Sequence, residues 1–173
     1  ELKLKHISPL FLLRHIRFLR RSASMEHKLG RRFIKKNGFA PPFYLVLSPI
    51  LQCNLNCAHC YTPQREGGAQ EQMSYAVLKR VISEQNQLWC SYFTVLSGGE
   101  PFLYNDQGKT ILDLAREFPR QLFFIYTNGT LLTTANIKTI GKLKNISLTI
   151  SIEGDKLLTE KVRGKGIWQQ ILT

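Results

Sequence analysis

Three cysteines lie within eight residues, and their spacing is the feature of this sequence with the clearest chemistry. Cys53, Cys57 and Cys60 form a C-x3-C-x2-C pattern directly after an apolar segment. Thiolates this close together can surround one metal centre, and coordination stabilises their deprotonated form. Three ligands would leave a 4Fe–4S cluster with one iron open to another ligand. A structural zinc site would need a fourth side chain, for which His59 and Cys90 are the candidates. An inert group of buried cysteines is the third alternative.

A second group with chemical potential, Ser97-Gly98-Gly99-Glu100-Pro101, follows the next apolar segment along the chain. A glycine pair at the end of a strand is often only a turn. If the two strands are parallel, however, this group lies at the same edge of the sheet as the cysteines, where α/β proteins bind ligands. The glycines allow close backbone approach, and the Glu100 carboxylate suits an ammonium group.

The elements that must position these groups are predicted by alternating apolar runs and helical spacing. Strands are predicted over 43–50, 92–97, 122–127 and 146–152, and helices after Ser74, over 111–118, after Thr133 or Thr134, and over 167–173. Continuous apolar strands separated by helices are typical of a parallel α/β sheet. Four such units favour a doubly wound sheet or about half of a (β/α) barrel, because a complete barrel needs about 250 residues.

The formal charge of +12 is concentrated at the N-terminus. Residues 1–40 carry eleven Lys and Arg residues against two acidic ones, whereas residues 41–173 carry thirteen against ten. A basic amphipathic helix is predicted there, with apolar and basic residues on opposite sides: Leu12, Ile16 and Leu19 on one, Arg14, Arg17 and Arg21 on the other. An arm with a solvated basic face and contact with a membrane surface are both open alternatives. Nucleic-acid binding is disfavoured because no nucleic-acid-binding fold is recognisable.

The composition excludes several classes of protein. Of the 173 residues, 43% are hydrophobic and 21% charged, which excludes disordered and collagen-like chains. No run of 18 apolar residues occurs, so a conventional transmembrane helix is not expected. The sequence has four cysteines and no recognisable signal peptide, which favours a reducing, cytoplasmic location. A cytoplasmic protein could also associate with a membrane through the basic arm.

Together, the cysteine pattern after the first strand and the Gly-Gly-Glu-Pro group after the second resemble the radical S-adenosylmethionine (radical SAM) enzymes over residues 43–173. The resemblance implies the N-terminal portion of a partial (β/α) TIM-like barrel, with four β/α units over 41–173 preceded by the basic arm over 1–40. It also implies roles for individual residues. The 4Fe–4S ligands would be Cys53, Cys57 and Cys60, and the methionine amino group of S-adenosylmethionine would be received by Gly98, Gly99 and Glu100. The position before the third cysteine is usually aromatic, on the adenine side of the cofactor, and is His59 here.

Further along, Ser151-Ile-Glu153-Gly154 resembles the S-x-D-G motif of the peptide-modifying and maturation branch of this family. Arg163 follows Ser151 by twelve residues, and in that branch the serine and arginine contact the ribose and carboxylate of the cofactor. Glu153 stands where the branch usually has aspartate, and Thr159-Glu160 stands where it usually has His-Asp. These two departures weaken the transfer of the branch's substrate chemistry to this chain. The sequence Thr127-Asn128-Gly129 is predicted equally as a turn and as part of the site. Cys90 is expected to be a buried structural thiol.

The resemblance implies an enzyme that cleaves S-adenosylmethionine reductively to a 5′-deoxyadenosyl radical, which abstracts hydrogen from a substrate. That substrate, a small molecule or a peptide, is not defined by the sequence. A low-potential electron donor, flavodoxin or ferredoxin, is implied as a partner. The competing hypothesis is a non-enzymatic iron–sulfur or zinc module tethered by its basic arm to a membrane surface or nucleic acid. Because four strands cannot close a barrel, we expect a longer natural protein, continuing for about 100 or more residues, and an isolated chain that is poorly stable or associated.

Overall fold

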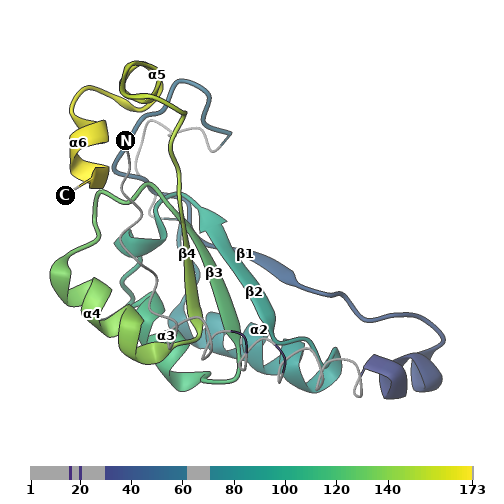
Figure 1. Ribbon diagram of the computed structural model, residues 1–173. Helices are drawn as coiled ribbons and strands as arrows, with labels where there is room; N and C mark the ends of the chain where they lie inside the picture. The colour runs from purple at the N-terminus through teal and green to yellow at the C-terminus, as the bar shows by residue number, and fades with distance from the viewer. Residues whose placement is uncertain (1–15, 17–19, 21–29, 62–70, 173) are drawn as a thin grey trace.

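The computed structural model describes residues 16, 20, 30–61 and 71–172 (Figure 1). Most of the amphipathic helix expected in the arm lies outside these residues. Residues 30–37 form a helix whose basic side chains are exposed, namely Arg31, Arg32, Lys35 and Lys36. Within the described part of the chain, no helix is long and apolar enough to cross a membrane.

Four parallel strands form one open sheet in the order β1-β2-β3-β4. The strands are β1 (Leu45–Ile50), β2 (Phe93–Gly98), β3 (Leu122–Thr127) and β4 (Ile146–Ile150). All four predicted strands are therefore present, and the expected partial parallel barrel is confirmed. Because the strands are parallel and follow one another in sequence, all their carboxyl ends meet at one edge of the sheet.

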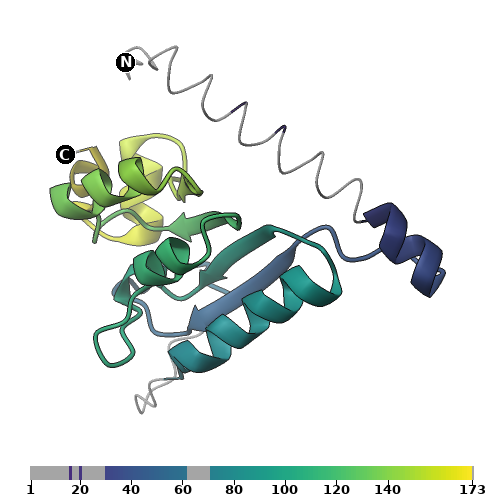
Figure 2. The ribbon, with the colours of Figure 1, turned by 90° about the horizontal axis from the view of Figure 1, so that it is seen from below.

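Three helices cover one face of this sheet: α2 (Tyr75–Leu88), α3 (Ile111–Glu117) and α4 (Thr134–Leu143) (Figure 2). Two of their starts are fixed by the predicted caps, since Ser74 Oγ accepts from Val77 N at 3.3 Å and Thr133 Oγ1 accepts from Asn136 N at 3.2 Å. Such caps satisfy backbone N–H groups that the first helical turn leaves without partners. The core lies between the sheet and these helices, and its fully buried members include Leu78, Ile82, Leu96, Leu114, Phe123 and Ile125.

Three short elements lie at the carboxyl edge of the sheet: η1 (Pro101–Leu103), α5 (Lys156–Arg163) and α6 (Ile167–Leu172) (Figure 1). The sequence analysis predicted α6 but neither η1 nor α5. Helix α5 begins at Asp155, whose carboxylate accepts from Leu158 N at 2.8 Å. Its two leucines, Leu157 and Leu158, are exposed, so the helix has no buried apolar stripe that would have predicted it from the sequence.

Candidate cofactor site

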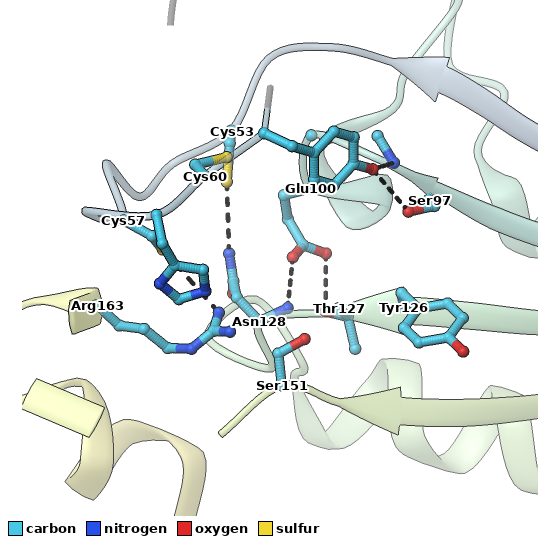
Figure 3. Close-up of a pocket in the computed structure, with 14 residues that line it drawn as sticks. Cys53, Cys57, Cys60, Ser97, Glu100, Tyr126, Thr127, Asn128, Ser151 and Arg163 are labelled. Carbon is cyan, nitrogen blue, oxygen red and sulfur yellow. Dashed lines mark hydrogen bonds between the residues drawn. The ribbon is translucent and has the colours of Figure 1, made fainter. Parts of the chain in front are cut away.

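A cavity of about 190 Å³ opens at the carboxyl edge of the sheet (Figure 3). All nine predicted site residues line it: Cys53, Cys57, His59, Cys60, Gly98, Gly99, Glu100, Ser151 and Arg163. They come from three loops that are far apart in the sequence. The same cavity is also lined by Tyr61, Ser97, Tyr126, Thr127 and Asn128. The structure thus brings the predicted residues together, while their roles toward a cofactor remain predictions.

The three cysteines of the loop after β1 share one wall of this cavity. Burial raises the pKa of the Cys57 thiol, and the neighbouring Cys53 and Cys60 raise it further, whereas the Arg163 guanidinium acts in the opposite direction. Among the described residues, no three His, Cys, Asp or Glu side chains converge on a single metal ion. In a 4Fe–4S cluster each thiolate binds a different iron, so its ligands do not have to meet at one point. The donor set therefore fits the cluster that the sequence predicted.

Cys90 lies far from this cavity. It precedes β2, whereas the cysteine loop follows β1, so the length of a six-residue strand, about 20 Å, separates them. The prediction that Cys90 could be the fourth ligand of a zinc site is therefore wrong. Cys90 is half-buried rather than buried, and it has a positive φ of 55°.

The glycine loop after β2 packs directly against the segment that leads into the cysteine loop. Gly99 N donates to Ile50 O and Glu100 N donates to Gln52 O, both at 2.9 Å. A Cβ at Gly99 would lie 2.6 Å from Leu51 O, closer than real Cβ atoms approach such an oxygen. Glycine is required here because the two loop backbones are in contact, and this contact fixes the glycine loop relative to Cys53.

Glu100 is almost completely buried, with 1% of its surface exposed, and it joins the ends of β2 and β3. Its Oε1 accepts from Thr127 Oγ1 and its Oε2 from Asn128 N, both at 2.8 Å (Figure 3). Oε1 also accepts from Phe102 N at 3.1 Å. A carboxylate has about four acceptor positions. Three of these are used by the protein, so Glu100 is a structural connection between two strand ends as well as a lining residue of the cavity.

Asn128 continues this connection to the cysteine loop. Its Nδ2 donates to Asn54 Oδ1 at 2.8 Å and lies 3.8 Å from Cys53 Sγ (Figure 3). The adjacent Gly129 has a positive φ of 81°, as a tight turn requires. The Thr127-Asn128-Gly129 segment is thus both a turn and a part of the site.

Tyr61 is a lining residue that the sequence analysis missed. Its hydroxyl lies 3.0 Å from Ser97 Oγ and accepts from Gly98 N at 3.3 Å, which ties the cysteine loop to the glycine loop a second time. An aromatic residue directly after the third cysteine was the signal in the sequence. Its partners could not be deduced, because they lie 36 and 37 residues further along the chain.

The third loop follows β4 and leads into α5. Ser151 N donates to Thr127 O at 2.9 Å, which extends the pairing of β4 with β3 to the rim of the cavity. Arg163, at the end of α5, donates through Nε to Glu153 Oε1 at 2.9 Å. Ala58 N donates to Val162 O at 3.0 Å, so α5 is attached to the cysteine loop through the backbone as well.

The fold and the site together define a class of α/β proteins: a partial parallel barrel with a three-cysteine loop and a glycine loop at one edge of its sheet. The sequence profile described as the Radical SAM superfamily matches residues 47–173. The chain belongs to the radical SAM superfamily, whose members use a 4Fe–4S cluster and S-adenosylmethionine.

Comparison with known proteins gives relatives of which this chain covers only a part. The chain is 31% identical over 132 residues to the Fe-coproporphyrin III synthase of Methanosarcina barkeri. The aligned region covers 74% of this chain and 32% of the synthase. Its fold is similar to that of SuiB from Streptococcus suis bound to S-adenosylmethionine, with a TM-score of 0.65 and 22% identity over 84% of this chain and 33% of that one. It is also similar to anSMEcpe with bound AdoMet, with a TM-score of 0.60 and 21% identity over 76% and 39% of the two chains. The chain spans about a third of the length of the first two.

Proposed function

We propose that this chain is the N-terminal part of the catalytic core of a radical SAM enzyme. The observation that carries this proposal is the meeting of nine predicted residues, from three separate loops, around one cavity at the carboxyl edge of the sheet. Membership of the superfamily supports the same conclusion.

In this proposal the thiolates of Cys53, Cys57 and Cys60 hold the 4Fe–4S cluster. When bound, the cluster supplies one electron that cleaves S-adenosylmethionine to methionine and a 5′-deoxyadenosyl radical, which takes a hydrogen atom from the substrate. Low-potential electrons for this step come from a reduced flavodoxin or ferredoxin.

The remaining lining residues orient S-adenosylmethionine. Gly98 and Gly99 line the cavity without side chains that would obstruct it, and the fourth acceptor position of the Glu100 carboxylate is suited to the methionine ammonium group. Ser151 and Arg163 are assigned to the ribose and carboxylate, and His59 to the adenine side, by analogy with the superfamily motif.

We further propose that the substrate is a peptide or a small organic molecule that enters beside the cofactor. A second cavity, of about 620 Å³, lies on the face of the sheet opposite α2, α3 and α4 and shares Tyr61, Ser97 and Tyr126 with the first. SuiB is described with its precursor peptide SuiA bound, which supports a peptide substrate. The name of the M. barkeri relative supports a small organic molecule.

The test is anaerobic reconstitution with iron and sulfide, followed by incubation with S-adenosylmethionine and dithionite. We expect 5′-deoxyadenosine and methionine in equal amounts by mass spectrometry. Cys57→Ala should form neither product, and the matched control Cys90→Ala should form both. A colourless, zinc-loaded protein that never cleaves S-adenosylmethionine would overturn the proposal and favour the non-enzymatic alternative.

A further inference from the structure

Four polar side chains meet beside the cavity, two from the cysteine loop and two from the segment that follows β4, and Glu153 is at their centre. Its Oε1 accepts from Arg163 through both Nε, at 2.9 Å, and Nη2. The same oxygen lies 3.6 Å from His59 Nε2. The third nitrogen of the guanidinium, Nη1, lies 4.0 Å from Cys57 Sγ.

This geometry determines which edge of the guanidinium faces the cysteine loop. Because Glu153 takes Nε and Nη2, the remaining Nη1 is the group turned toward the sulfur. The Arg163 side chain is only 12% exposed and that of Glu153 24% exposed, so water screens this ion pair less than it would screen a pair at the surface. Arg163 therefore owes its orientation to Glu153.

The backbone around this ion pair is fixed from two sides. Glu153 N donates to Thr159 Oγ1 at 3.2 Å, and Thr159 is fully buried. Ala58 N, next to Cys57, donates to Val162 O at 3.0 Å. The segment before α5 and the last turn of α5 thus reach the cysteine loop together, which places a positive charge beside one predicted cluster ligand.

We propose that Glu153 is a positioning residue that holds the Arg163 guanidinium against the sulfur of Cys57, so that the positive charge favours the reduced form of the cluster. This inference rests on the proposed function. A hydrogen-bond donor or a positive charge next to a cluster ligand raises the reduction potential of the cluster, because it stabilises the reduced, more negative oxidation state.

The two possible actions of Glu153 predict opposite results for Glu153→Ala, which removes the acceptor of Arg163 together with the charge. If Glu153 acted only through its own negative charge, removing that charge would shift the reduction potential upward. If Glu153 acts by holding Arg163, the released guanidinium turns to solvent and its charge is lost from Cys57. Arg163 Nη1 lies 4.0 Å from Cys57 Sγ, whereas the contacts of Glu153 are with Arg163 and His59. Because charge interactions weaken with distance, losing the guanidinium outweighs losing the carboxylate, and the net shift in potential is then downward.

The experiment is an anaerobic redox titration of the reconstituted protein, followed by electron paramagnetic resonance. We expect a downward shift for Glu153→Ala, a downward shift for Arg163→Met, and no further shift when the two are combined. Glu160→Ala, which removes a glutamate from the helix that carries Arg163, is the matched control and should leave the potential unchanged. An unchanged or upward shift for Glu153→Ala would overturn the inference.

A second measurement uses the protein without cofactors, so that it does not depend on cluster assembly. In nitrogen-15 NMR spectra the Arg163 Nε–H should be protected from solvent exchange, and this protection should be lost in Glu153→Ala but kept in Glu160→Ala. Protection that survives Glu153→Ala would also overturn the inference. If the unmodified protein binds no cluster at all, the proposed function fails first, and the two failures are distinguishable.

Discussion

Replacing Gly99 by Ala is the sharpest perturbation of this site, because the contact it would disturb is between two backbones. An added Cβ would lie 2.5 Å from Gln52 C and 2.6 Å from Leu51 O. Ordinary carbon–oxygen contacts are about 3.3 Å or longer. The two loops must therefore separate by several tenths of an ångström or more, and the segment that leads to Cys53 must move with them.

The expected cost to stability has two parts, weakened hydrogen bonds and steric overpacking. Separation of the loops weakens the bonds from Gly99 N to Ile50 O and from Glu100 N to Gln52 O, each worth about 1 kcal/mol net. Overpacking of this kind adds about 1–3 kcal/mol. We therefore expect Gly99→Ala to lower the free energy of unfolding by about 3–5 kcal/mol, and to lower the iron bound after reconstitution.

Urea unfolding of the protein without cofactors measures this cost, and two other glycines provide matched controls. Gly141, within α4, has open space where a Cβ would be added, with nothing within 4 Å, so Gly141→Ala should stabilise the protein by about 0.5–1 kcal/mol. Gly108 is equally open but has a positive φ of 81°, so Gly108→Ala should cost about 1–2 kcal/mol through backbone strain alone. A smaller loss for Gly99→Ala than for Gly108→Ala would refute the steric argument.

Three further predictions concern the thiols, the buried carboxylate and alkaline pH. Replacing any of Cys53, Cys57 or Cys60 by Ala should abolish bound iron after reconstitution, whereas Cys90→Ala should retain it; full iron content in Cys57→Ala would contradict the ligand assignment. Glu100→Ala should lower the free energy of unfolding by about 3 kcal/mol, because it leaves buried donors of Thr127 and Asn128 without their acceptor; a loss below about 1 kcal/mol would contradict that role. Burial raises the pKa of Tyr104 to about 12, so stability should fall as the pH rises from about 10 through 12, where unfolded tyrosine ionises first. Tyr104→Phe should flatten this part of the stability profile in urea titrations, and an unchanged slope would show that another group is responsible.

Much of the fold was predictable because its signals are local. Continuous apolar runs predicted all four strands, since a parallel strand buries side chains on both of its faces. Ser74 and Thr133 predicted two helix starts, because a cap and the backbone N–H from which it accepts lie within three residues of each other. The position of the cysteine and glycine loops at one edge followed from the parallel order of β1 and β2.

Buried polar contacts could not be predicted in this way. Two apolar residues of α2, Val77 and Leu88, are exposed, whereas the polar Gln85 of the same helix is buried. Gln85 donates to Phe93 O and accepts from Thr94 Oγ1, both at 2.8 Å, so its amide is satisfied in the interior. Hydrophobicity alone assigns such a side chain to the surface, because its partners appear only once α2 lies against β2.

The sequence by itself determined the class of fold and the chemical inventory of the site: three thiols, a glycine pair and a carboxylate on the loops that follow β1 and β2. Only the tertiary structure decided how these groups are held. The ties from Tyr61 to Ser97, from Asn128 to Asn54 and from Arg163 to Cys57 join residues 36, 74 and 106 positions apart. No periodicity or local motif encodes such pairs, because they form only when the sheet brings its strand ends together.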